Sequence, residues 1–324
     1  MHTVILAVLV GFVAALGCGH FLIPALQKLK AGQSIREDGP KSHLKKAGTP
    51  TMGGIFITIG VLAAAIIFLS QTGSYLWYAV IGATAFGLIG FIDDLIKVLK
   101  HRSLGLKPYQ KIVAQVVFAA LVSVYAYQNP AIGSSLYVPI LDTYWDLGIW
   151  YIPFTMFVII AMTNSANLTD GLDGLAGSVT LVSAATFTLI LFPFIEQTVW
   201  GEDMAVFAAA FTGAILAFLR YNAYPAKVFM GDVGSFFLGG ALTMMAIVSR
   251  LQLLLPVMCI MYVVSSISCI LQVGSYKLRG GKRIFKMAPL HHHFELSGVH
   301  ETKIVCVYTI ITVIGCLIAL LMVN

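Results

Sequence analysis

Carboxylates in this chain gather at the ends of apolar segments, close to lysine. Asp93 and Asp94 stand beside Lys97 in the string FIDDLIK, and Asp232 precedes another apolar run. A carboxylate at the centre of a membrane helix costs roughly 2.5 to 3.5 kcal/mol, so several together favour a compensating cation. Mg²⁺ prefers such oxygen ligands. The structural alternatives are an ordinary ion pair between Asp93 and Lys97, four residues apart, and capping of a helix by Asp232.

Two further segments carry polar groups suited to nucleotides or phosphates. Residues 164–174 (NSANLTDGLDG) offer amides, carboxylates and glycines, which suit ribose hydroxyls, a base edge or a metal; a tight turn is the alternative. Residues 279–295 are basic and include His291, His292 and His293. Consecutive helical side chains differ by ~100°, so the three imidazoles cannot share one metal. They suit phosphate oxygens, whereas lipid headgroups alone would explain the lysines but not the histidines.

A fifth segment, residues 36–54, is a basic loop that enters an apolar run through TPTMGG. Taken alone, it is typical of a cytoplasmic anchor with proline at a helix start.

The elements that must position these groups are membrane helices. Of 324 residues, 59% are hydrophobic and only 10% are charged, against roughly a quarter charged in soluble domains, which excludes a soluble enzyme. Only helices and closed barrels span lipid, and the apolar runs lack the alternation of barrel strands. We therefore predict one all-α integral membrane domain over residues 1–324. Its transmembrane helices, about ten, are expected near residues 3–26, 52–70, 75–92, 110–128, 149–165, 175–195, 204–220, 233–249, 254–276 and 303–323.

The basic residues predict the topology of this bundle. Every Lys and Arg except Arg250 falls in loops on one side of it. The positive-inside rule assigns that side to the cytoplasm and both termini to the extracytoplasmic side. Topology thus explains the net charge of +6 without nucleic acid. The candidate site lies on the cytoplasmic face, and the outer loop 128–150 is compatible with a short hairpin.

Five strings occur in a fixed order along the chain: GTPTMGG (48–54), FIDDLIK (91–97), NLTDGLDGLA (167–176), NAYPAKVFMGDVGS (222–235) and FKMAPLHHHFE (285–295). Together they resemble the phospho-N-acetylmuramoyl-pentapeptide transferase family, within the polyprenyl-phosphate N-acetylhexosamine-1-phosphate transferases. The resemblance covers nearly the whole chain, although Val299 and His300 fit it less well.

The resemblance implies an activity, a cofactor and a location. The activity is Mg²⁺-dependent transfer of phospho-MurNAc-pentapeptide from its UDP carrier to undecaprenyl phosphate, which releases UMP and makes lipid I for peptidoglycan synthesis. The location is the cytoplasmic membrane of a bacterium, and the family suggests a homodimer.

The resemblance also implies roles for individual residues. Asp232 is expected to bind Mg²⁺ and, with Asp93, Asp94 and His291, to form the catalytic group. Asp173 is expected to accept from the uracil edge, with Phe229 stacking on the base. The full set of expected substrate contacts is Lys46, Thr51, Lys97, Lys111, Asn167, Asp170, Gly171, Asp173, Asn222, Phe229, Gln272, His292 and His293.

Three alternatives concern mechanism and class. A two-step reaction through a phospho-aspartyl enzyme stays open, but we expect direct attack, because a phosphomonoester is largely a dianion above ~6 and leaves Asp93 a secondary role as base. A sibling transferase using UDP-N-acetylglucosamine would share the carboxylates, but the three histidines argue against it. A membrane transporter would place charges near mid-membrane on several helices, which none of the ten runs clearly does.

Overall fold

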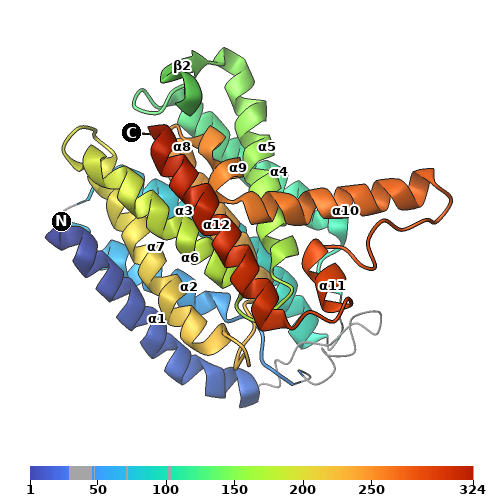
Figure 1. Cartoon of the computed structure of the whole chain (residues 1–324). Coiled ribbons are helices and arrows are strands. Elements are labelled where there is room, and N and C mark those ends of the chain that lie inside the picture. The colour runs from blue at the N-terminus through green and yellow to red at the C-terminus, as the bar shows by residue number, and fades with distance from the viewer. Residues whose placement is uncertain (29–45, 47, 71, 101, 103, 324) are drawn as a thin grey trace.

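The computed structural model describes residues 1–28, 46, 48–70, 72–100, 102 and 104–323, which form a bundle of helices (Figure 1). Most of the helices are long and apolar and run side by side, as the composition predicts. In chain order they are α1 (His2–Lys28), α2 (Gly54–Ile67), α3 (Ser74–Leu99), α4 (Pro108–Gln128), α5 (Tyr151–Thr169), α6 (Leu175–Leu191), α7 (Gly201–Asn222), α8 (Gly231–Val248), α9 (Leu255–Met258), α10 (Ile260–Leu278), α11 (Leu290–Glu295) and α12 (Glu301–Val323).

All ten predicted apolar runs are helical, but two of them differ from a straight span. Within the described residues, eight helices are long and apolar enough to cross a membrane. Helix α2 has only 14 residues, fewer than the roughly 20 that a straight span needs. The run 254–276 is broken at Cys259, where the axis bends by 81° between Gln252–Met258 and α10. The chain is therefore a multi-pass membrane protein, while ten full spans and the side of the termini stay predictions.

Helix α8 is the centre of the bundle. Every residue from Val233 to Val248 is buried, so neighbouring helices surround it completely there. Its first turn is packed backbone against backbone with α2, because a Cβ at Gly54 would lie 2.0 Å from Cα of Gly234. Small residues permit such close approach of membrane helices. This packing brings the N-terminal ends of α2 and α8 to the same end of the bundle.

A buried carboxylate fixes the N-terminal end of α3. Asp203 of α7 accepts hydrogen bonds from the backbone N–H of Gly73 (2.5 Å) and of Leu76 (3.0 Å). The first N–H groups of a helix have no partner within the helix, so Asp203 caps α3 from a neighbouring helix.

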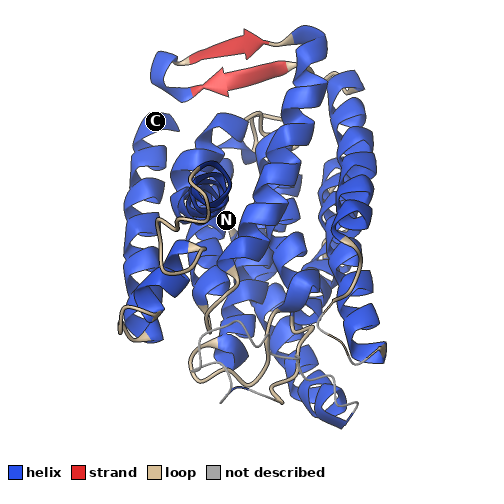
Figure 2. Ribbon diagram, turned by 90° about the vertical axis from the view of Figure 1, so that its right-hand side faces the viewer, coloured by secondary structure: helices blue, strands red, loops and turns tan. Residues whose placement is uncertain are grey.

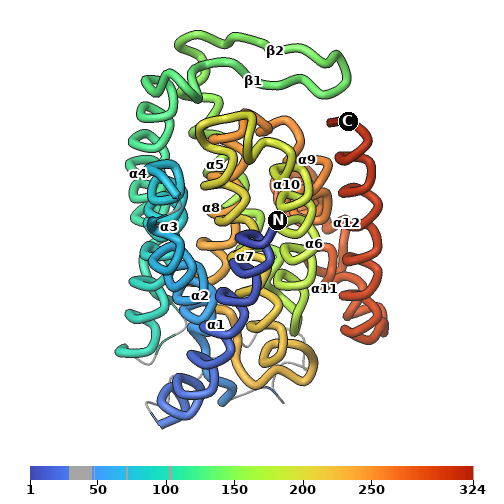
Figure 3. Tube along the Cα trace, turned by 90° about the vertical axis from the view of Figure 1, so that its left-hand side faces the viewer, coloured from blue at the N-terminus to red at the C-terminus, as the bar shows by residue number. Residues whose placement is uncertain are grey.

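The outer connection between α4 and α5 forms a hairpin of β1 (Ser135–Val138) and β2 (Thr143–Asp146), which are antiparallel. Arg250 holds it in place: its guanidinium donates to the carbonyl of Ala131 (2.9 Å), and its own carbonyl accepts from the N–H of Tyr137 (3.0 Å). The hairpin covers one end of the bundle (Figure 2), and α11 lies toward the other (Figure 3). The hairpin considered for loop 128–150 is confirmed.

Candidate active site

Three carboxylates from two helices meet at the end of the bundle away from the hairpin. Asp93 and Asp94 lie near the C-terminal end of α3, and Asp232 lies in the first turn of α8. One oxygen atom from each lies within 4.8 Å of the other two. Gly231 makes the turn into α8 with a φ of +75°, and a Cβ there would lie 2.4 Å from Asp94 Oδ2. Only glycine fits this turn, which places Asp232 beside the α3 pair.

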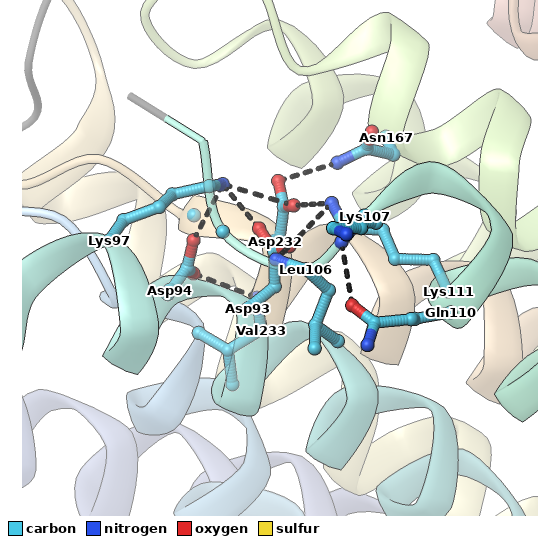
Figure 4. Close-up of polar contacts among 12 residues, drawn as sticks. Asp93, Asp94, Lys97, Leu106, Lys107, Gln110, Lys111, Asn167, Asp232 and Val233 are labelled. Carbon is cyan, nitrogen blue, oxygen red and sulfur yellow. Dashed lines mark hydrogen bonds and ion pairs between the residues drawn. The ribbon is translucent and has the colours of Figure 1, made fainter. Parts of the chain in front are cut away.

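Two lysines balance most of this negative charge (Figure 4). The Lys97 ammonium lies 2.6 Å from Asp93 Oδ2, 3.2 Å from Asp94 Oδ1 and 3.1 Å from Asp232 Oδ2. The Lys111 ammonium, from α4, lies 3.0 Å from Asp93 Oδ1 and 2.5 Å from Asp232 Oδ2. The ion pair considered as the structural alternative is thus present inside the cluster. With all five side chains ionised, the centre carries one net negative charge.

Neutral donors fix the orientation of each carboxylate. The Asn167 amide, from α5, donates to Asp232 Oδ1 and to the Ser235 hydroxyl, both at 2.9 Å. The backbone N–H of Leu106 donates to Asp93 Oδ1 at 2.7 Å, and that of Val233 donates to Asp94 Oδ2 at 3.1 Å. Asp93 and Asp94 are buried, and the side chain of Asp232 is 16% exposed. Asp232 is therefore the most accessible of the three to an incoming ligand.

The donor set of this cluster fits Mg²⁺. All candidate ligand atoms are carboxylate oxygens, which Mg²⁺ prefers over the nitrogen and sulfur ligands typical of zinc. The Lys97 ammonium already contacts all three carboxylates, so their geometry accommodates a central positive charge.

A second ion-pair group joins Lys46 to the connection between α5 and α6 and to the first residue of α12. The Lys46 ammonium lies 2.7 Å from Asp173 Oδ1 and 2.7 Å from Glu301 Oε2, and the N–H of Ala226 donates to Asp173 Oδ2 at 2.9 Å. Desolvation lowers the pKa of Lys46, but hydrogen bonds and charges from Asp173 and Glu301 outweigh it and raise that pKa. Lys46 is therefore cationic at neutral pH. No motif marks Glu301, since its partner Lys46 comes from a distant segment of the chain.

The 164–174 segment lies beside His291, the first of the three histidines. The ring of His291 is fully buried, and a Cβ at Gly171 would lie 2.2 Å from its Nε2. Burial, followed by the charges of Asp232, Asp94 and Asp173, raises the pKa of the partly buried Asp170 to about 8. Asp170 is thus mainly a neutral acid at pH 7 and can donate a hydrogen bond.

Several predicted substrate contacts use their polar groups on the protein itself. Asn222 accepts from the N–H of Gly174 (3.1 Å) and donates to the carbonyl of Val228 (2.9 Å). Gln272 donates to the carbonyl of Phe285 (2.9 Å) and accepts from that residue's N–H (3.0 Å). Both amides hold loops in place, and their contact with substrate stays a prediction.

His292 and His293 both lie in α11. His293 Nδ1 accepts from the N–H of Lys286 (3.1 Å), and His292 Nδ1 lies 3.3 Å from Glu295 Oε2. Each ring is thus held by a contact within the segment 286–295, and its contact with phosphate or sugar stays a prediction.

The TPTMGG turn pairs with the segment that precedes α8. The N–H of Phe229 donates to the carbonyl of Pro50 (2.8 Å), and its carbonyl accepts from Gly53 (2.8 Å). Thr51 is buried, and its hydroxyl would lie 2.8 Å from a Cβ at Gly231. Thr51 therefore borders the carboxylate cluster, while stacking of the half-buried Phe229 on a base stays a prediction.

The fold and this centre define a class: a multi-pass membrane protein with a carboxylate–lysine site suited to phosphate chemistry at one end. Residues 76–250 match glycosyl transferase family 4, and residues 46–57 match phospho-N-acetylmuramoyl-pentapeptide-transferase signature 1. The chain belongs to the phospho-N-acetylmuramoyl-pentapeptide-transferase family.

Relatives that carry this name align along almost the whole chain. The Clostridium novyi protein is 48% identical over 321 residues, covering 99% of this chain and 97% of the relative. The Clostridium kluyveri protein is 47% identical over 321 residues, covering 99% of each chain. The Caldanaerobacter subterraneus protein is 48% identical over 315 residues, covering 97% of each chain.

Proposed function

We propose that the protein transfers phospho-MurNAc-pentapeptide from UDP-MurNAc-pentapeptide to undecaprenyl phosphate, forming lipid I and UMP. The observation that carries the proposal is the carboxylate–lysine centre at one end of an apolar bundle, in a chain of this family. A water-soluble nucleotide and a membrane lipid phosphate can meet only at such a surface. We place that end at the cytoplasmic face of a bacterial cytoplasmic membrane, with both termini outside.

Mg²⁺ is the proposed cofactor, with Asp232 as its main ligand and Asp93 and Asp94 within reach. When bound, it screens the repulsion between the diphosphate and the attacking phosphate. A divalent cation held by these residues would change the formal charge of the five ionised side chains from −1 to +1. Without it the centre repels both anionic substrates, so substrate binding is expected to depend on the metal.

The protein's own groups have distinct parts in direct displacement. Lys97 and Lys111 supply positive charge to the phosphates, and Asn167 orients Asp232. An oxygen of the lipid phosphate attacks the β-phosphorus of the nucleotide, and the bond from that phosphorus to the bridging oxygen breaks to release UMP. The lipid phosphate is already a dianion near neutral pH, since its second pKa is ~6. Asp93 is buried, its Oδ1 accepts a hydrogen bond from Leu106, and its Oδ2 forms an ion pair with Lys97, so it is left a secondary role as base.

The decisive experiment measures UMP release by purified protein in detergent with a polyprenyl phosphate. UDP-MurNAc-pentapeptide and UDP-N-acetylglucosamine are compared, each with Mg²⁺ and with EDTA. We expect release only from the muramoyl substrate, lost with EDTA and with Asp232→Asn. The matched control, Asp142→Asn, removes a carboxylate from the hairpin and should leave the rate unchanged.

Other outcomes redirect the assignment. Release from UDP-N-acetylglucosamine would indicate the sibling transferase, and release from neither, with folded protein, would favour a transporter. The homodimer suggested by the family is tested separately, by light scattering of the protein–detergent complex.

A further inference from the structure

A pair of side-chain amides, the buried Gln115 and the partly buried Asn164, lies one helical turn away from the carboxylate centre. Gln115 of α4 follows Lys111 by four residues, and Asn164 of α5 precedes Asn167 by three, so each shares a helix face with a residue that contacts Asp232. The Asn164 amide donates to Gln115 Oε1 at 2.6 Å. This hydrogen bond joins α4 directly to α5 beside the centre.

The two helices hold Asp232 from different sides. Lys111 contacts its Oδ2 atom, and Asn167 contacts its Oδ1 atom. The orientation of this carboxylate therefore depends on the spacing between α4 and α5. The Gln115–Asn164 hydrogen bond is a polar contact that joins these two packed helices beside Asp232.

The stability of the folded protein does not by itself favour glutamine at position 115. Its side chain is fully buried, and its Nε2 atom has no hydrogen-bond partner among the described residues. An unpaired buried donor destabilises the folded state, and an apolar side chain of similar size would avoid this penalty. The benefit of Gln115 must then come from what its oxygen atom holds in place.

We propose that Gln115 is a positioning residue for the transfer reaction. Its carbonyl oxygen anchors Asn164, sets the α4–α5 spacing, and so keeps Lys111 and Asn167 on opposite oxygens of Asp232. The inference rests on the proposed function, because it is through Asp232 that Gln115 affects turnover. Gln115 itself touches neither substrate nor metal.

The first test is Gln115→Met, which keeps the length of the side chain and removes the amide. We expect the kcat of UMP release to fall about 10-fold, since small misplacements of reacting groups are costly. The half-activating Mg²⁺ concentration should rise several-fold, while the KM for the nucleotide stays within about twofold. A loss of thermal stability with unchanged kcat and unchanged Mg²⁺ dependence would overturn the proposal.

The second test is a double-mutant cycle with Asn164→Ala. If the two amides act through one hydrogen bond, the double variant should be no slower than the slower single variant. Losses that multiply to about 100-fold would show independent roles and contradict the proposal. Should Gln115→Met not fold, Gln115→Asn, which is shorter by one methylene, replaces it in the same cycle.

Ser123 provides the matched control on the same helix. Its hydroxyl is also buried without a hydrogen-bond partner among the described residues, but it lies two turns further along α4 from Gln115. Ser123→Ala should leave kcat and Mg²⁺ dependence unchanged. A loss equal to that of Gln115→Met would assign the effect to α4 packing in general.

A readout independent of turnover separates this proposal from the proposed function. Mg²⁺ is expected to raise the melting temperature of the wild-type protein, and to raise that of Gln115→Met less. If the wild type releases no UMP, the proposed function fails, and the melting shift still tests the positioning of Asp232. Equal shifts in the two proteins would overturn the role of Gln115.

Discussion

Gly90 of α3 lies directly against the backbone carbonyl of Asp232 on α8: a Cβ at position 90 would lie 2.1 Å from that oxygen. Gly90→Ala must therefore push the first turn of α8 away from α3, although it removes no polar group. We predict that UMP release falls about 100-fold, the effect expected of a displacement near 1 Å at a catalytic group.

The matched control for this substitution is Gly17→Ala on α1. A Cβ at Gly17 meets no atom within 4 Å, so this variant should retain wild-type turnover. Full activity of Gly90→Ala would show that the contact between α3 and α8 does not set the position of Asp232.

Asp93 and Asp232 are predicted to respond differently to the same substitution. Asp93→Asn removes a charge but can still accept the hydrogen bond from Leu106, and the lipid phosphate needs little help to lose its proton. We expect measurable turnover, reduced about 10- to 100-fold, whereas Asp232→Asn should lower it about 100- to 1,000-fold. Complete loss in Asp93→Asn at every pH, with fold and Mg²⁺ binding intact, would assign Asp93 the primary role.

The raised pKa of Asp170 predicts that the stability of the folded protein depends on pH. Its pKa is raised to about 8, against ~3.9 in an unfolded chain. Between these values the unfolded state releases a proton that the native state retains, so the free energy of unfolding falls as pH rises. Asp170→Asn removes this contribution. Measured in EDTA, the melting temperature of the variant relative to wild type should increase from pH 5 to pH 8; a difference that is constant with pH would contradict the prediction.

Asp203 is predicted to matter for stability and not for turnover. Asp203→Ala removes the acceptor for two N–H groups at the start of α3 and should cost about 1 to 3 kcal/mol. Asp203→Asn keeps one acceptor and should cost less. Chemical denaturation measures the loss, and kcat well below the melting temperature should stay near wild type. A loss of kcat at temperatures well below the melting temperature would show that the cap also affects the active site.

The sequence predicts the composition of the centre well because strong physical costs govern it. Carboxylates at the ends of apolar helices need compensation, and the charge bias of the loops puts the motifs on one face. Asp93, Asp94, Lys97 and Asp232 accordingly lie together in the structure.

What the sequence does not predict are contacts between helices far apart in the chain. The partners of Asp203, Gln115 and Glu301 are set by packing, and no local pattern marks them. The bend at Cys259 is also invisible to hydropathy, which averages over a whole apolar run and carries no information on its direction. Gln272 illustrates the same limit. A polar amide near the motifs suggests a contact with the substrate, whereas this amide donates a hydrogen bond to the carbonyl of Phe285 in a loop.

The hairpin end of the bundle is acidic apart from Arg250, which is bound to the hairpin, so the protein is electrically polar along its length. The connections 129–150 and 192–200 contain no Lys or Arg but carry Asp142, Asp146 and Glu196. Positive charge is concentrated near the opposite end, beside the site. We expect the surrounding lysines and arginines to attract an approaching nucleotide diphosphate over about a Debye length, ~10 Å at 0.1 M salt, before it reaches the carboxylate–lysine centre. Raising the ionic strength should lower kcat/KM for the nucleotide more than kcat, as salt screens that long-range steering.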